Sequence, residues 1–175
     1  PNTVTSIGQY AFLNCSKLPS VIIPNSVTTL LNNSFNGCTG LTSVTLSNTL
    51  ATIGNAAFQG DVSLNSITFP NSVTNIGSYA FTNCTDLTNI VFGNAVNTLG
   101  VDTFRYINKL QNLTLPATLT SIGTNCFANT SVVNLIVQDI SSITLSSGGL
   151  GFTLTSLQTF ECYSNTDRKS TRLNS

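Results

Sequence analysis

The sequence lacks several residue types on which common functions depend. Its 175 residues include no histidine, no tryptophan and no methionine, and charged residues make up only 7%. Histidine is the residue that enzymes use most often as a general acid or base, so its absence argues against acid–base catalysis. We therefore predict that the chain is not an enzyme and that it needs no cofactor.

The few charges are balanced, with six basic and six acidic residues. Binding to nucleic acid needs a clustered basic field, which the sequence does not provide. No apolar run approaches the roughly 20 residues that would span a bilayer. We predict no nucleic-acid partner and no membrane insertion for this segment. Arg105, Tyr106 and Lys109 form a small basic cluster, for which a local ion pair of Arg105 with Asp102 is favoured over a ligand contact.

An internal repeat of 23 residues dominates what the sequence does contain. Apolar residues recur at this spacing in four separate columns, which is the signature of a repeat architecture. The clearest column consists of phenylalanines: Phe12, Phe35, Phe58, Phe81, Phe104 and Phe127. We interpret residues 1–166 as one elongated solenoid of about six regular coils and an irregular seventh, in which a strand resumes over 157–162.

Each repeat reads as one coil with a short strand and a turn region. In the second repeat, Leu41, Val44 and Leu46 face one side of a strand, while Thr42, Ser43 and Thr45 face the other. An Ile-Gly pair such as 53–54 places glycine where the chain bends or packs closely, and the phenylalanine column turns inward. The pattern predicts a parallel β-sheet on the concave side, short turns or 3₁₀ segments on the convex side and little regular helix.

The repeat pattern Leu-x-x-Val-x-Leu-Pro, followed by Val-x-x-Ile-Gly-x-x-Ala-Phe-x-x-Cys, resembles the BspA-like class of leucine-rich repeats over residues 1–138. The resemblance implies a right-handed leucine-rich-repeat coil. It also implies a cell-surface or secreted protein that binds protein or glycan ligands in adhesion or interaction. Two alternatives stay open, namely a structural spacer in a larger protein and, less favoured, a surface that orders water or ice.

We interpret the cysteines as unreactive, buried thiols. Cys15, Cys38 and Cys84 share one column, in which Asp61 replaces cysteine between Cys38 and Cys84. Ligands that lie along a line do not converge on a metal ion, so we predict no metal site. A Cys15–Cys38 disulfide is geometrically conceivable, but a column of buried free thiols is favoured. Cys126, in a column of small residues, is expected to be buried as well.

The outward side of the predicted sheet is the candidate binding site. Its columns hold serine, asparagine and threonine on rigid parallel strands, where hydrogen-bonding groups could hold a protein or glycan. The alternative is that these residues only keep strand surfaces soluble. Anchoring tryptophan and charged residues are scarce, so affinity should be weak. The candidate contact residues are Thr45, Ser66, Thr68, Asn89, Asn112 and Thr114.

Both ends of the sequence are expected to be incomplete. There is no start methionine, and Pro1 lies one period before Pro24, in mid-coil. Residues 167–175 break the repeat and resemble the in-frame translation of a sequencing-adapter oligonucleotide, so we interpret them as a non-native tail. Residues 1–166 would then be a fragment of a longer array. Because terminal coils without caps expose apolar surface and strand edges, we expect end-to-end self-association.

Overall fold

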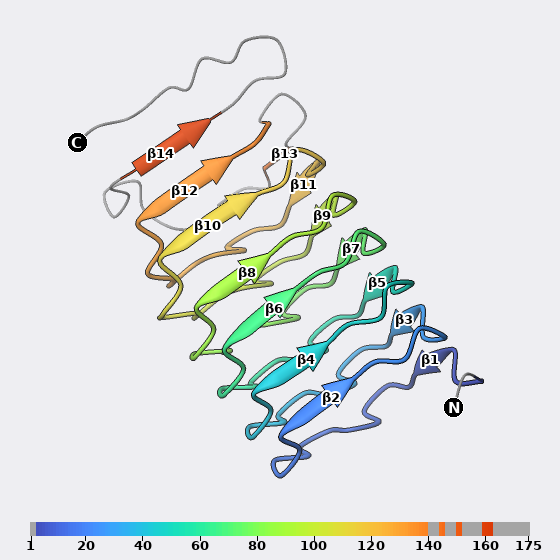
Figure 1. Ribbon diagram of the computed structural model, residues 1–175. Coiled ribbons are helices and arrows are strands. Elements are labelled where there is room, and N and C mark those ends of the chain that lie inside the picture. Colours follow the sequence, from blue (N-terminus) through green and yellow to red (C-terminus); the bar gives the residue numbers. More distant parts are fainter. Residues whose placement is uncertain (1–2, 140–143, 146–149, 152–158, 163–175) are drawn as a thin grey trace.

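The computed structural model is a stack of coils in which each turn of the chain lies on the one before (Figure 1). It describes residues 3–139, 144–145, 150–151 and 159–162. Within these ranges the secondary structure consists of strands and turns, without α-helix or 3₁₀-helix. The solenoid of parallel strands that the repeat predicts is confirmed, and turns alone connect the strands.

One strand of each coil lies in what we call the first ladder, the predicted parallel sheet. Its outward side chains alternate with inward apolar ones such as Val44 and Ile67, which is the strand period that the sequence predicts. The strands are β2 (Ser20–Ile22), β4 (Ser43–Thr45), β6 (Ser66–Thr68), β8 (Asn89–Val91), β10 (Asn112–Leu115), β12 (Asn134–Val137) and β14 (Thr159–Cys162).

A second ladder of two-residue strands was not expected from the sequence. It joins seven coils in one uninterrupted parallel sheet, in register at each step, as in the pairing of Ile53 with Ile76. Five of these strands end on the apolar residue of an Ile-Gly or Leu-Gly pair. They are β1 (Ser6–Ile7), β3 (Thr29–Leu30), β5 (Thr52–Ile53), β7 (Asn75–Ile76), β9 (Thr98–Leu99), β11 (Ser121–Ile122) and β13 (Thr144–Leu145).

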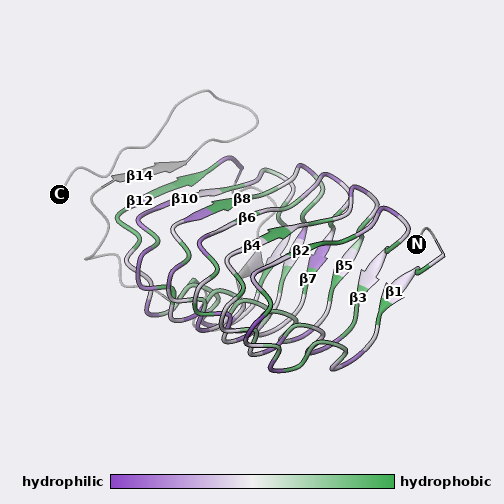
Figure 2. Ribbon diagram, turned by 60° about the horizontal axis from the view of Figure 1, so that its bottom comes forward, coloured by the Kyte–Doolittle hydropathy of each residue, from purple (hydrophilic) through white to green (hydrophobic). Residues whose placement is uncertain are grey.

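The phenylalanine column forms the continuous stack that the spacing predicts. Neighbouring rings are nearly parallel, with centroids 5.3 Å apart for Phe35–Phe58 and 5.2 Å for Phe58–Phe81. Five of the six rings are fully buried, whereas Phe12 in the first coil, which stacks on Phe35, is 38% exposed. Hydrophobic segments recur in every coil (Figure 2), so the core runs along the whole stack.

Two left-handed backbone positions in each of the first six coils flank the phenylalanine and produce the turn. In the fourth coil they are Tyr79 and Asn83, with φ values of 62° and 63°. The second of these columns also holds Gly37 and Gly60 at positive φ, as expected where the left-handed region favours glycine. A tyrosine such as Tyr79 is unusual at a left-handed position, because a bulky side chain raises the energy of this conformation.

Polar side chains bond one coil to the next, which explains why asparagine and threonine are so common. The Asn32 side-chain oxygen accepts from the Asn55 backbone N–H at 2.8 Å, and the Asn55 side chain accepts in turn from Ser78 at 2.9 Å. Glycine in the adjoining column permits this close approach. A Cβ on Gly123 would lie 2.4 Å from the backbone of Gly100, so the predicted need for close packing is confirmed.

The 23-residue spacing of paired strands changes in the last two steps of the first ladder, to 22 residues and then 25. The strand that was expected to resume in the seventh coil is β14, which pairs with β12 so that Leu135 lies opposite Phe160. In the step before it, Asn112 pairs with Asn134. The glycine-rich turn at 146–149, Leu157 and the proposed tail at 167–175 lie outside the described residues.

Candidate ligand-binding face

The outward side chains of the first ladder form a surface that we call the first-ladder face. All six candidate contact residues lie on it and are solvent-exposed, at strands that are neighbours in space. Ser66 lies directly opposite Asn89 in the β6–β8 pair. The sequence therefore places these side chains correctly, and their role in binding stays a prediction. The residues are Thr45, Ser66, Thr68, Asn89, Asn112 and Thr114.

This face is less uniformly polar than the sequence analysis assumed. Ile22 and Val91 occupy the same outward column as Thr45 and Thr68, and they are 76% and 44% exposed. Both residues can be found in the sequence, at the 23-residue spacing of this column. Sequence reasoning overlooked them because it selected the hydrogen-bonding members of the column.

The first ladder is interrupted between β4 and β6 and between β8 and β10, which the sequence analysis did not predict. Parallel hydrogen bonding joins β2 to β4, β6 to β8, and β10 to β12 and β14. At the paired steps, Ile23 donates to Thr45 at 2.9 Å and Phe69 to Val91 at 2.8 Å. Between β4 and β6, and between β8 and β10, the described backbone makes no such bond, although the strands remain adjacent.

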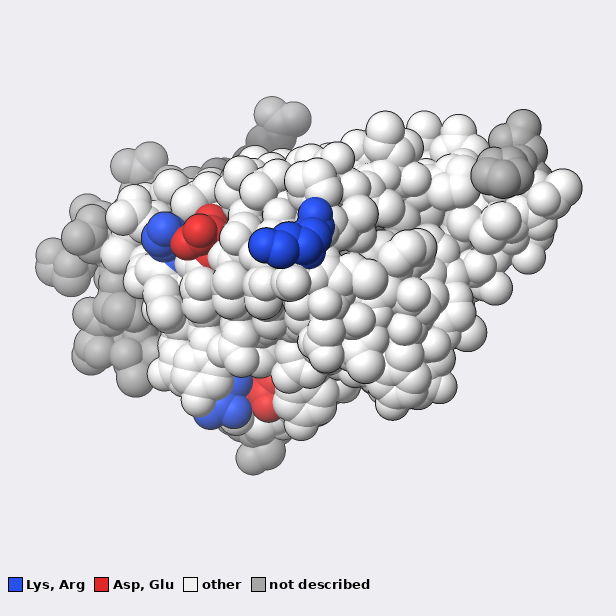
Figure 3. All heavy atoms as spheres, turned by 90° about the horizontal axis from the view of Figure 1, so that it is seen from below, with Lys and Arg blue, Asp and Glu red and all other residues white. Residues whose placement is uncertain are grey.

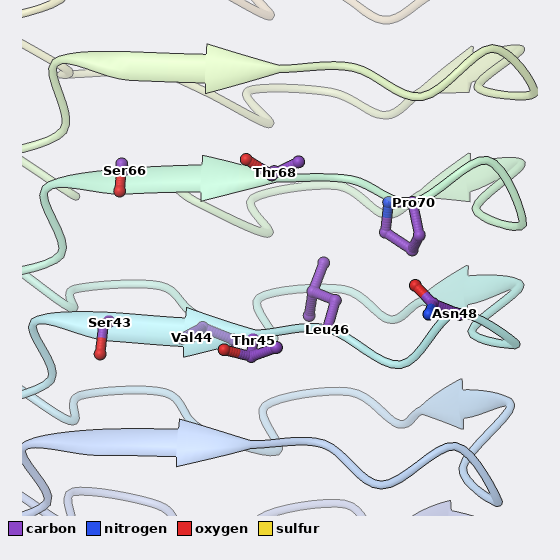
Figure 4. A pocket seen from close by; sticks show the side chains of 8 residues that line it. All are labelled: Ser43, Val44, Thr45, Leu46, Asn48, Ser66, Thr68 and Pro70. Carbon is purple, nitrogen blue, oxygen red and sulfur yellow. The ribbon is translucent and has the colours of Figure 1, made fainter.

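Each interruption coincides with a groove in the face. Groove 1 lies between β4 and β6 and has a volume of about 360 Å³. Leu46 and Pro70 point toward each other across it (Figure 4). Its remaining lining is polar or small and consists of Ser43, Val44, Thr45, Asn48, Ser66 and Thr68.

Groove 2 lies between β8 and β10 and also has a volume of about 360 Å³. The polar side chains that line groove 2 are mainly amides, whereas those of groove 1 are mainly hydroxyls. The half-buried Phe92 contributes apolar surface to groove 2. Its lining includes Asn89, Asn94, Asn112, Thr114, Gln138, Val91 and Pro116. The six candidate residues are thus divided between the two grooves.

A third groove, which we call the connecting groove, links the other two beside the carboxyl ends of β6 and β8. It has a volume of about 500 Å³ and shares Asn48 and Thr68 with groove 1, and Val91 and Phe92 with groove 2. The three grooves therefore make one path that crosses the strands. We call this path the trough.

An asparagine column along the trough follows the same alternation as the ladder. The Asn25 side chain accepts from the Asn48 N–H at 3.2 Å, and the Asn71 side chain accepts from the Asn94 N–H at 2.9 Å. Within the described residues, the side chains of Asn48 and Asn94 make no hydrogen bond to the protein, and both are exposed. Two amides therefore remain available, one at groove 1 and one at groove 2.

The cysteine column lies inside the stack and contributes nothing to this face. Cys15, Cys38, Cys84 and Cys126 are free thiols, so the favoured interpretation is confirmed and the Cys15–Cys38 disulfide is wrong. Cys15 alone is half-buried, in the first coil. The Cys38 thiol donates to the Phe12 carbonyl at 3.1 Å. Burial raises the pKa of Cys38 to about 11 and that of Cys126 to about 12, which keeps these thiols protonated and unreactive.

Asp61 is the one carboxyl group in the cysteine column, and it is completely buried. One of its oxygens accepts from the Cys38 N–H at 2.8 Å, and its other oxygen has no hydrogen-bond partner. Burial raises its pKa to about 8, against a smaller lowering effect of the Cys38 and Gly37 N–H groups. No group of three or more metal-ligating side chains exists in the described part of the chain.

The basic cluster is neutralised by local partners. The Arg105 guanidinium lies 3.6 Å from the Asp102 carboxylate and 4.6 Å from the centre of the Tyr106 ring. The ion pair expected for Arg105 is confirmed, although Asp102 is buried where a solvated site was expected. Lys109 bonds Asp86 of the preceding coil at 2.7 Å. Charged side chains are few on the surface seen in Figure 3, and none of these residues lines the trough.

Comparison with known proteins identifies the repeat. The family described as BspA type leucine rich repeat region matches in six copies, over residues 1–106 and 28–147. Comparison with curated proteins finds no match. A search for a membrane-spanning helix, carried out over the described residues, finds none long and apolar enough.

Solved structures with the same fold cover most of this chain. A leucine-rich repeat protein from Bacteroides ovatus is 31% identical, with a TM-score of 0.66 over 82% of this chain and 43% of that one. The pneumococcal vaccine antigen PcpA has a TM-score of 0.69 over 81% of this chain and 38% of its own, but at 23% identity it shows the fold alone. A leucine rich cell surface protein from Faecalibacterium prausnitzii is 26% identical, with a TM-score of 0.57 over 83% of this chain and 48% of that one. The chain thus spans less than half of each of these proteins.

Proposed function

Because the chain belongs to the BspA-type leucine-rich repeat family, we propose that it is a non-catalytic module that binds a protein or glycan ligand through the first-ladder face. We further propose that the parent protein lies at the cell surface or is secreted and acts in adhesion or interaction. The similarity to a leucine rich cell surface protein supports this location.

The observation that carries the proposal is the trough. Ligand sites are concave, largely pre-formed and lined by apolar surface with a few convergent polar groups. The trough combines these features on an uninterrupted core, because the phenylalanine stack and the second ladder continue beneath its grooves. A spacer would need the inter-coil asparagine and threonine bonds, but it would not need exposed apolar residues such as Ile22 and Val91 among polar ones.

Two lysine substitutions on the face test this function. Thr68→Lys and Asn89→Lys introduce bulk and charge at exposed positions of β6 and β8, where neither side chain supports the fold by a described hydrogen bond. Thr39→Lys is the matched control, because Thr39 is exposed in a turn outside the trough.

The measurement is retention on extracellular-matrix proteins and glycans immobilised as an array. We expect the wild-type chain and Thr39→Lys to be retained equally and the two face variants to lose retention. Retention that survives both face substitutions would place binding elsewhere on the molecule. The absence of any retention of the wild-type chain would favour the spacer.

A further inference from the structure

From the geometry of the trough we infer that its ligand is a linear, uncharged polysaccharide that crosses the strands from groove 1 to groove 2. This inference rests on the proposed binding function and adds the class of ligand. It depends on the lining chemistry, on the two unpartnered amides and on the way the coils are joined.

The lining chemistry is suited to an uncharged ligand. No charged side chain lines groove 1, groove 2 or the connecting groove within the described part of the chain. An acidic or basic polymer would therefore lose hydration without gaining a partner of opposite charge. The hydroxyls of Thr45 and Thr68 and the amides of Asn48 and Asn94 both donate and accept hydrogen bonds. Sugar hydroxyls have the same dual character.

Apolar surface in the trough is suited to the C–H faces of sugar rings. The half-buried Pro70 borders groove 1, while the half-buried Phe92 and the exposed Val91 border groove 2. Phe92 stacks on the buried Phe69, with centroids 5.5 Å apart, so its ring is held in place from below. A sugar chain presents hydroxyl edges and apolar faces together, which matches a groove with both.

The free amides are placed where the ladder is interrupted. At the paired steps, the side chains of Asn25 and Asn71 already accept hydrogen bonds from the next coil. At the interrupted steps, Asn48 and Asn94 keep their side-chain groups for a ligand. These two positions are two coils apart, which is about 10 Å at the spacing of stacked strands. A regular polymer that repeats its hydroxyl groups along its length can bond to both amides at once, which strengthens weak single contacts.

A peptide strand fits the same site less well. Strand addition requires an exposed sheet edge, and the interruptions lie between neighbouring strands. The gap is too narrow for another strand, because the second ladder pairs β3 with β5 and the rings of Phe35 and Phe58 lie 5.3 Å apart. A ligand must therefore lie over the grooves, with its groups directed into them.

The test uses three neutral polysaccharides, dextran, laminarin and mannan, with heparin and gelatin as anionic and polypeptide probes. Binding is measured by titration calorimetry on the full chain. We expect at least one neutral polysaccharide to bind, and we expect the double variant Asn48→Ala, Asn94→Ala to weaken its Kd by about tenfold or more. The control Asn65→Ala, which removes an exposed amide outside the trough, should bind as the wild type does.

Unfolding curves of the three proteins establish that the substitutions leave the fold intact, as expected for side chains without a described bond. The inference is overturned if the wild type binds none of the three neutral polysaccharides, or if the double variant binds as tightly as the control. Binding of heparin or gelatin alone, when weakened by the double variant, would overturn the assignment to a neutral polysaccharide while leaving the proposed binding function in place.

Discussion

Replacing Asp61 by cysteine should make the solenoid more stable at neutral pH and remove a specific pH dependence. Asp61 occupies a buried position that cysteine fills in the coils on either side, at Cys38 and Cys84. Its pKa is raised from 3.8 to about 8 by burial. At pH 7 the folded chain therefore holds a proton that the unfolded chain releases.

The magnitude follows from the two pKa values. Between about pH 4 and pH 8 the folded state binds one more proton than the unfolded state, so the free energy of unfolding falls as the pH rises. The stabilisation is fully present below the unfolded pKa of 3.8 and is lost by about pH 8. At roughly 1.4 kcal/mol per pH unit, the loss at pH 7 is about 4 kcal/mol. A thiol, which stays neutral, avoids this loss.

The assay is urea unfolding at pH 4, 5, 6, 7 and 8 under reducing conditions. We expect Asp61→Cys to differ little from the wild type near pH 4 and to exceed its stability by about 3–4 kcal/mol at pH 7. Asp86→Asn serves as the control, because Asp86 is paired with Lys109 at the surface and should leave the steep dependence in place. Equal pH slopes for the wild type and Asp61→Cys would refute the argument.

Three further predictions concern the stack and its turns. Phe81→Ala should lower the free energy of unfolding by about 3–5 kcal/mol through cavity formation, and Phe12→Ala by clearly less, since that ring is 38% exposed; equal losses in urea unfolding would contradict the stacking argument. Tyr79→Asn should raise stability by about 1 kcal/mol, because asparagine tolerates the left-handed φ of 62° better than tyrosine; a loss in thermal unfolding would show that the ring contributes more than its backbone costs. Since Phe12 and Val4 leave apolar surface open in the first coil, the chain should associate end to end, and light scattering that stays monomeric across a concentration series would count against it.

The regular part of the fold could be predicted from the sequence because each column repeats the same physical demand. Phe58 and Phe81 occupy equivalent positions, so a single burial argument covers the entire stack. The outward positions of Thr68 and Asn89 follow from strand alternation in the same way. The second ladder could not be predicted with equal ease, because strands of two residues are too short to show a period.

The trough could be predicted only in part. Its exposed hydroxyls and amides can be read from the repeat, whereas the grooves between unpaired strands cannot. Asn25 and Asn71, whose side chains bond the next coil, both stand in Pro-Asn-Ser-Val, whereas Asn48 follows Ser47 and Asn94 follows Gly93. The alternation of these bonds thus has a counterpart in alternate repeats of the sequence, which an argument from a single coil cannot show.

The alternating ladder also has a mechanical consequence. The second ladder is continuous on one side of the coils, while the first is interrupted between β4 and β6 and between β8 and β10. A bending load should therefore concentrate its deformation at those two junctions, with the continuous ladder as the axis of rotation. The coils would then move as stiff blocks, each held by its own paired strands. A ligand that bridges both junctions would resist this bending, so occupancy of the trough and the stiffness of the solenoid should rise together.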